Sequence, residues 1–119
     1  MPSPPDPVRG AADLLVLSVI ADEPLYGYAI GQRIEVRSEG RLRLGPGALY
    51  PLLHQLESDG HIKATWDGPE QGGRPRKWYR LTAKGRRHLA RRAEAHRRLI
   101  DVITSFLPDG LGGAAGKDA

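Results

Sequence analysis

Basic residues concentrate in the second half of the 119-residue chain, and this distribution suggests that they bind a polyanion. Residues 61–98 hold twelve Lys and Arg residues against three acidic residues, a net charge of +9, although the whole chain carries only +4. Such asymmetry is typical of proteins that bind nucleic acid or an anionic membrane. A solvated basic helix would give the same count, so the surrounding elements must decide.

Catalytic chemistry fits the sequence poorly. The four histidines have no metal-ligand spacing with carboxylates on a shared face: they are His54, His61, His88 and His96. No glycine-rich phosphate loop is present, and no motif places a Ser, His and Asp set. Cysteine is absent, which excludes disulfides, zinc–thiolate sites and cysteine nucleophiles. We therefore predict a protein that is not an enzyme and that uses no cofactor or metal.

Residues 46–60 form the segment best suited to meet such a partner. Its leucines are Leu49, Leu52, Leu53 and Leu56. Their helical spacing predicts an amphipathic helix with one apolar face. The outward face carries small or uncharged residues: Gly47, Pro51, His54 and Ser58, flanked by Tyr50 and Gln55. Such a plain face suits a surface pressed against a partner, although an ordinary packing helix would look the same.

Two helices and a short strand are predicted before this segment. Residues 11–21 are apolar almost all round, so we expect a helix that is buried on most sides. Residues 26–38 form a second helix, in which the spacing of Gly27 and Gly31 indicates close helix packing. Residues 41–44 alternate arginine with leucine and predict a very short strand.

A hairpin with a basic loop follows the central helix. Residues 61–67 and 76–81 alternate like two strands. One face of the first strand is expected to carry Ile62, Ala64 and Trp66. The loop between the strands, residues 68–75, is too long and glycine-rich for a tight turn. The basic residues near its downstream end are Arg74, Arg76 and Lys77. Such a hairpin with a flexible basic tip is a wing.

The last helix is predicted over residues 83–107, with Thr82 as its N-cap. About 25 residues span about 37 Å, which is longer than so small a domain needs. Its predicted stripe comprises Leu89, His96, Leu99, Ile100, Ile103, Phe106 and Leu107. An apolar stripe on an overlong terminal helix needs a partner, so we predict that it pairs with a second copy of the chain. The alternative is that the helix folds back on its own domain.

The order of these elements is that of a winged helix-turn-helix domain, so we expect a mainly α fold with a small β-hairpin. Four parts are predicted: a flexible arm (1–10), the DNA-binding domain (11–82), the dimerisation helix (83–107) and a disordered tail (108–119). In such a domain the third helix enters the major groove of DNA, and the wing reaches the adjacent backbone or minor groove.

Few side chains on the third helix could hydrogen-bond to base edges. The residues expected there are Gly47, Ala48, Pro51 and His54. Sequence discrimination would then depend on contacts with thymine methyl groups and on DNA shape. The basic residues would supply the affinity, which should fall steeply with salt.

Several motifs, in this order, resemble those of the PadR family of bacterial transcriptional regulators. They are LYGYAI (25–30), PGALYP (46–51), Leu53 with Leu56 and Gly60, GGRPRK (72–77) with Tyr79, and LTAKG (81–85). The resemblance covers about residues 11–107. It implies a homodimer that represses transcription by binding an inverted repeat in a promoter, with dimer contacts in the last and first helices. It often also implies release by a small aromatic or lipophilic effector.

The resemblance and the residue patterns together define the candidate DNA contacts. They are Tyr28, Arg43, Gly47, Ala48, Tyr50, Pro51, His54, Arg74, Arg76 and Lys77. Two positions depart from the family pattern: Gly45 and Ala48 stand where hydroxyl residues are common. A contact there must be made by the backbone or be absent. The last helix also lacks tryptophan, which puts an aromatic effector site at the dimer centre in doubt.

Two other binding functions fit the basic composition. The chain could be a winged helix that binds RNA, or an adaptor whose basic helix binds an acidic protein. A dimer stripe favours duplex DNA, because a palindrome rewards two-fold symmetry. The start of the chain has no apolar signal core and the apolar run 14–21 is too short to span a bilayer, so we expect a cytoplasmic protein.

Overall fold

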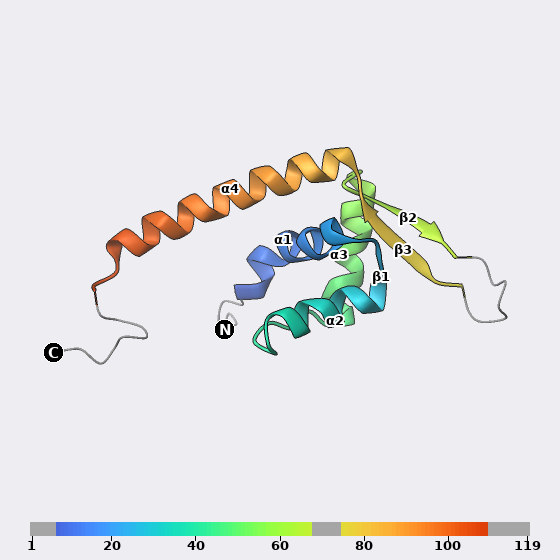
Figure 1. Ribbon diagram of the computed structural model, residues 1–119, viewed down its shortest axis with the longest axis horizontal. Coiled ribbons are helices and arrows are strands. Elements are labelled where there is room, and N and C mark those ends of the chain that lie inside the picture. Colours follow the sequence, from blue (N-terminus) through green and yellow to red (C-terminus); the bar gives the residue numbers. More distant parts are fainter. Residues whose placement is uncertain (1–6, 68–74, 110–119) are drawn as a thin grey trace, which may run out of the picture.

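The computed structural model describes residues 7–67 and 75–109. The elements follow in the order α1 (Pro7–Asp22), β1 (Leu25–Tyr26), α2 (Gly27–Arg37), α3 (Pro46–Ser58), β2 (Ile62–Trp66), β3 (Lys77–Leu81) and α4 (Ala83–Phe106). Helices α1, α2 and α3 lie together beside the hairpin, and α4 runs along α1 and projects beyond it (Figure 1). The predicted fold class, mainly helical with a small antiparallel sheet, is confirmed.

The sheet has three strands in the order β1-β3-β2, and both pairings are antiparallel. Strand β1 pairs Leu25 with Tyr79, while β2 pairs Ile62 with Leu81. The sequence predicted the hairpin but not β1. The strand predicted over residues 41–44 is wrong, because that segment has no strand partner within the described chain.

Residues 41–44 still alternate between outside and inside without forming a strand. Leu44 is buried and Leu42 is half-buried, while Arg43 is exposed. The backbone N–H of Leu42 donates to the hydroxyl oxygen of Ser38 at 2.9 Å. A side-chain hydroxyl therefore accepts a hydrogen bond from the backbone of this segment, where a strand would have used a backbone carbonyl of a partner strand.

Helix α1 begins earlier than predicted. Residues 7–10 are helical, so the expected flexible arm over residues 1–10 is wrong for these four residues. Pro7 suits the first position of a helix, because its missing N–H would have no intrahelical partner there. The remaining arm residues, 1–6, and tail residues 110–119 lie outside the described residues.

The core lies between the first three helices and the sheet. The predicted leucine face of α3 is confirmed, with Leu49, Leu53 and Leu56 buried and Leu52 packed against the core. Helix α1 contributes core residues from Ala12 to Ile20, and Val16 and Leu17 are fully buried. Burial of the leucine face therefore determines which residues of α3 point to solvent.

Four elements meet where α3 ends and α4 begins. Gly60 has φ of +80°, and the N–H groups of Gly60 and His61 donate to Glu57 and Leu56 carbonyls at 3.0 and 2.9 Å. This Schellman motif ends α3 and directs the chain into β2. The N-cap predicted for α4 is confirmed, because the Thr82 hydroxyl oxygen accepts a bond from the N–H of Gly85 at 2.9 Å.

Gly85 lets α4 approach the start of β2 closely. A Cβ atom at this position would overlap the carbonyl group of His61 and lie 2.8 Å from Cδ1 of Leu81. On the other side of the junction, the rings of His61 and His88 stack at 4.1 Å. Burial lowers the pKa of His61, and the electrostatic effects of His88 and Lys84 act in the same direction. His61 is therefore a neutral packing residue.

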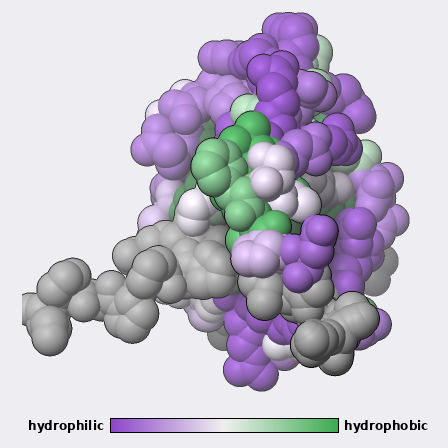
Figure 2. Space-filling view, turned by 90° about the vertical axis from the view of Figure 1, so that its left-hand side faces the viewer, coloured by the Kyte–Doolittle hydropathy of each residue, from purple (hydrophilic) through white to green (hydrophobic). Residues whose placement is uncertain are grey.

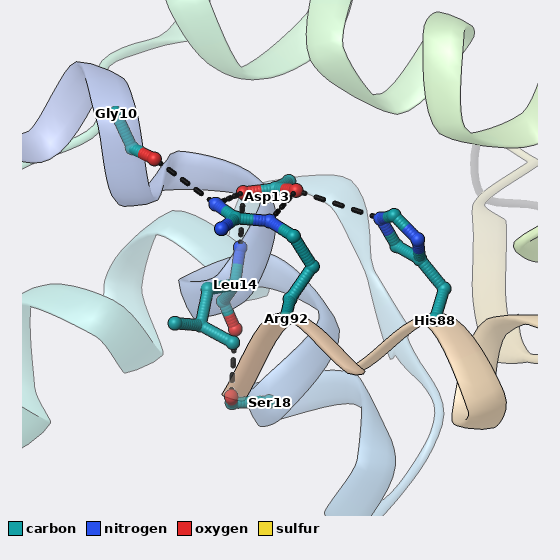
Figure 3. Close-up of polar contacts among 6 residues, drawn as sticks. All are labelled: Gly10, Asp13, Leu14, Ser18, His88 and Arg92. Atoms are coloured by element: carbon teal, nitrogen blue, oxygen red, sulfur yellow. Dashed lines mark hydrogen bonds and ion pairs between the residues drawn. The ribbon is translucent and has the colours of Figure 1, made fainter. Parts of the chain in front are cut away.

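A partly buried ion pair ties α4 to α1 (Figure 3). Arg92 donates from Nε to Oδ2 of Asp13 at 2.8 Å and from Nη2 to Oδ1 at 2.6 Å. The same Nη2 donates to the carbonyl of Gly10 at 3.0 Å, and Nε2 of His88 lies 3.6 Å from Asp13. The hydrogen bond from Arg92 lowers the pKa of Asp13, although partial burial acts in the other direction. This pairing fixes the direction in which α4 leaves the domain.

Replacing Gly85 with alanine should destabilise the fold by more than about 3 kcal/mol, because backbone must move to accept the methyl group. Gly10→Ala is the matched control, since it lies in α1 and its Cβ would meet nothing within 4 Å. Its effect should be neutral or stabilising by up to about 1 kcal/mol. Urea unfolding followed by circular dichroism measures both. Equal stability of the two variants would contradict the close approach.

Asp13→Asn should lower the free energy of unfolding at neutral pH, and this difference should shrink as the pH falls below about 4. The folded pKa of Asp13 is depressed, so its stabilising effect is present above the unfolded pKa. That effect is lost as the pH falls through the folded pKa. Urea unfolding at a series of pH values tests this, with the exposed Asp101→Asn as control. A difference that does not depend on pH would rule out this ion pair as the cause.

Candidate nucleic-acid interface

The outward face of α3 is exposed as predicted. Gly47, Ala48, Pro51 and His54 all lie on the surface, and Tyr50 is 41% exposed at the edge of this face. Gly45 is the N-cap, and no side chain caps the helix start. Gly45 and Ala48 carry no hydroxyl group, so any polar contact at these two positions must come from the backbone. This face therefore offers apolar surface for van der Waals contacts, and the imidazole of His54 is its one polar ring.

Tyr50 joins this face to the start of α2. A Cβ atom at Gly27 would lie 2.9 Å from Cε1 of Tyr50 and 3.1 Å from its hydroxyl oxygen. At Gly31 a Cβ would lie 3.2 Å from the carbonyl oxygen of Leu44. The predicted role of both glycines in close packing is therefore confirmed. Tyr28, 64% exposed beside Gly27, extends the same surface.

A hollow of about 330 Å³ lies between α2 and the start of α3. Its lining includes Tyr28, Gln32, Glu35, Arg43, Leu44 and Tyr50. Arg43 donates to the Glu35 carboxylate at 3.2 Å; the Arg43 side chain is largely exposed and Glu35 is half-buried. The fold thus brings Tyr28, Arg43 and Tyr50 together on one concave surface.

At the base of the wing, Arg76 and Lys77 point in different directions. The exposed Arg76 has its guanidinium 4.9 Å from the ring centroid of Tyr26. Lys77 turns toward α3, where its Nζ lies 3.4 Å from a carboxylate oxygen of Glu57. Its ammonium also lies over the rings of Trp66 and Tyr79. Lys77 therefore joins the wing to α3, whereas the guanidinium of Arg76 lies at the surface. Arg74 lies outside the described residues.

Strand pairing concentrates positive charge on the other face of the hairpin. Lys63 stands directly opposite Arg80, and both are exposed. Like charges in a directly opposed pair destabilise a sheet. An anion beside the hairpin would relieve this repulsion, which favours a polyanionic partner.

Helix α4 presents a second surface, made of apolar side chains near its C-terminal end. The exposed members are Leu99, Ile100, Val102, Ile103, Phe106 and Leu107. Seen from that end of the molecule, hydrophobic side chains form a patch among hydrophilic ones (Figure 2). Leu89 packs against the core of its own domain, and His96 is half-buried. The uncovered part of the predicted stripe therefore begins beyond His96.

Sequence patterns missed several residues of these surfaces. Alternation placed Trp66 on the same face of β2 as Ile62 and Ala64. The Trp66 side chain is nevertheless 63% exposed, because the core ends before the strand does. Val102 also belongs to the apolar surface of α4 and fell outside the predicted stripe. Trp78 was not singled out, although it contacts Tyr26 edge-on and hydrogen-bonds to Asp67 at 2.9 Å. The signal in the sequence for Trp78 is that both tryptophans of the chain lie in the hairpin.

Comparison with known proteins identifies the family. The model of the PadR-like family of transcriptional regulators matches residues 16–91. The chain belongs to this family. A transcriptional regulator of Mycobacterium tuberculosis is 35% identical to it over 109 residues, which cover 92% of this chain and 94% of the relative.

Solved structures of PadR-family and other transcriptional regulators share the fold. One from Eggerthella lenta, a PadR-family regulator, is 35% identical with a TM-score of 0.75, and the match covers 85% of each chain. One from Clostridium thermocellum is 26% identical with a TM-score of 0.79, covering 87% of this chain and all of the other. The protein is thus a DNA-binding transcriptional regulator of the PadR family with a winged-helix fold. In the described residues of this PadR protein, no helix is long and apolar enough to cross a membrane.

Gly27→Ala should weaken DNA binding about tenfold while changing the free energy of unfolding by less than about 1 kcal/mol. The added methyl group meets only the side chain of Tyr50, which is half-exposed and can turn away. Binding to duplex DNA and urea unfolding measure the two effects.

Tyr50→Ala should reproduce this loss of affinity, and the double variant should lose no more than either single variant. Gly31→Ala is the contrasting change, because its methyl group meets backbone and should cost stability. Additive losses in the Gly27 and Tyr50 double variant would exclude Tyr50 as the cause.

Proposed function

We propose that this regulator is a homodimeric repressor that binds an inverted repeat in promoter DNA. The observation that carries the proposal is the exposed apolar surface of α4, on the same chain as the exposed outward face of α3. One surface supports self-association and the other supports groove binding. A two-fold dimer presents two recognition helices in opposite directions, which is the symmetry of an inverted repeat.

The proposed dimer contact lies in the C-terminal half of α4. In the described chain, Ile100, Ile103 and Phe106 remain 49%, 49% and 81% exposed. Burying such side chains contributes about 1.5–3 kcal/mol each when burial is complete. Self-association of the helix would therefore remove this apolar surface from water.

The recognition helix would read DNA mainly by shape and apolar contact. Its outward face supplies Gly47, Ala48 and Pro51, which suit thymine methyl groups better than hydrogen-bonding base edges. Tyr28, Arg43, Tyr50 and His54 would add polar contacts around this face. Arg74 and Arg76 on the wing would supply attraction to phosphates, so the affinity should depend strongly on salt.

Release by a small lipophilic or aromatic effector is a further part of this proposal. Its support is the family resemblance together with the hollow of about 330 Å³ between α2 and α3, a volume within the range of ligand pockets. Because Tyr28, Arg43 and Tyr50 line this hollow, an occupant would compete with DNA for the same side chains.

Selection of bound fragments from a pool of genomic duplexes tests the proposal. Two inverted half-sites should be recovered, with their centres about 34 Å apart or a multiple of that distance. Filter binding against single-stranded RNA separates duplex DNA from the RNA alternative. If duplex binding showed neither sequence preference nor salt dependence, an adaptor for an acidic protein would replace the repressor.

Ile100→Asp should convert the dimer into monomers, because the dimer contact would bury an unpaired charge. Sedimentation velocity measures the mass. Ser105→Asp is the matched control, because Ser105 is exposed and lies about 140° around α4 from Ile100. The monomer should lose at least about tenfold in affinity for a duplex with two half-sites, yet bind one half-site as before. A dimer that survives Ile100→Asp would reject this contact surface.

A further inference from the structure

Trp66 is a large apolar side chain in an unexpected place. It follows Ile62 and Ala64 on the inner face of β2, but Ile62 is 2% exposed whereas Trp66 is 63% exposed. The strand continues past the hydrophobic core, so its last inward position has no core to pack against. An exposed indole on a DNA-binding wing therefore needs its own explanation.

The surroundings of Trp66 hold the indole beside α3. Trp66 pairs across the hairpin with Lys77, whose Nζ lies 5.7 Å from the indole centroid. Lys77 is held in turn by Glu57 of α3 at 3.4 Å. Just beyond the pair, the N–H of Asp67 donates to the carbonyl of Arg76 at 2.7 Å, so the strands remain paired there. The indole is thus presented on a fixed backbone next to the recognition helix.

The second tryptophan of the hairpin has a different environment. Trp78 lies on the opposite face of the sheet, contacts Tyr26 edge-on with ring centroids 5.2 Å apart, and donates from Nε1 to Asp67. Its polar and apolar parts both have partners within the chain. Trp66 has the Lys77 ammonium over its ring and a largely bare surface. The two side chains therefore differ in what remains available to a ligand.

We propose that Trp66 packs against the deoxyribose wall of bound duplex DNA where the wing meets the groove. This inference rests on the proposed function. Sugar rings offer apolar surface at the edge of the minor groove, and apolar side chains of DNA-binding proteins are used there. Lys77 is then a positioning residue, because its charge is engaged by Glu57 and the indole. Arg76, which lies beside Tyr26 on the opposite face of the hairpin, provides the phosphate contact.

Fluorescence of a single-tryptophan variant tests the contact directly. Trp78→Phe leaves Trp66 as the only tryptophan, and its emission should shift to shorter wavelength as a mixed-sequence duplex of about 30 base pairs is added at low salt. The shift should saturate together with binding measured by anisotropy of a labelled duplex. Trp66→Phe leaves Trp78, whose emission should change little and which reports that the wing remains folded.

Affinity as a function of salt distinguishes an apolar contact from a phosphate contact. Trp66→Ala should weaken binding about tenfold at every salt concentration, with an unchanged slope of log affinity against log salt. Arg76→Ala should reduce that slope by about one, because it removes one cation from a phosphate. Thr65→Ala is the matched control, because Thr65 is exposed on the other face of the same strand.

Normal affinity of Trp66→Ala, or emission from Trp66 that stays unchanged at saturating duplex, would overturn this inference and leave DNA binding intact. An emission shift that depends on protein concentration without DNA would place Trp66 in a protein contact, and would also overturn it. Failure of the unsubstituted protein to bind any duplex would instead reject the proposed function. These results are distinguishable in one set of titrations.

Discussion

The close approach of α4 to the start of β2 is the constraint on which the functional geometry depends. Gly85 has no side chain, so the helix backbone can lie directly against the His61 carbonyl. The Thr82 cap fixes where the helix begins. The same junction ends α3 through Gly60. One small region therefore sets the angle between the helix proposed to read DNA and the helix proposed to form the dimer. The Asp13–Arg92 pair then holds that angle at a second point.

Local sequence signals predicted the elements that depend on local chemistry. Leucine spacing identified the buried face of α3, and Thr82 was correctly placed as the cap of α4. The strand expected over residues 41–44 failed for the opposite reason. A strand requires a partner, and the edge of β3 that does not pair with β2 pairs with Leu25–Tyr26, more than fifty residues away in sequence. Alternation of residue types reports which side chains point inward, but not which backbone is available for pairing.

The candidate site shows the same division. The exposed residues of α3 followed directly from its leucine face, because a helix that buries one side must expose the other. The roles of Lys77 and Trp66 could not follow from sequence, since they depend on Glu57 and on where the core ends. Charge counting treated Lys77 and Arg76 alike, whereas the fold engages one with α3 and leaves the other exposed. The Asp13–Arg92 pair joins residues 79 positions apart, beyond any local pattern.

Helix α4 runs without interruption from the Thr82 cap to the apolar surface near Phe106. In the proposed dimer, α4 therefore fixes both the distance and the rotation angle between the domain and the apolar contact surface. One inserted residue would rotate everything beyond it by about 100° and lengthen the helix by about 1.5 Å. The rotation would change the direction of the apolar surface relative to α3, so the two recognition helices of the dimer would no longer face the same side. Helical phase, more than helix length, thus determines whether two domains can face the same side of a DNA duplex.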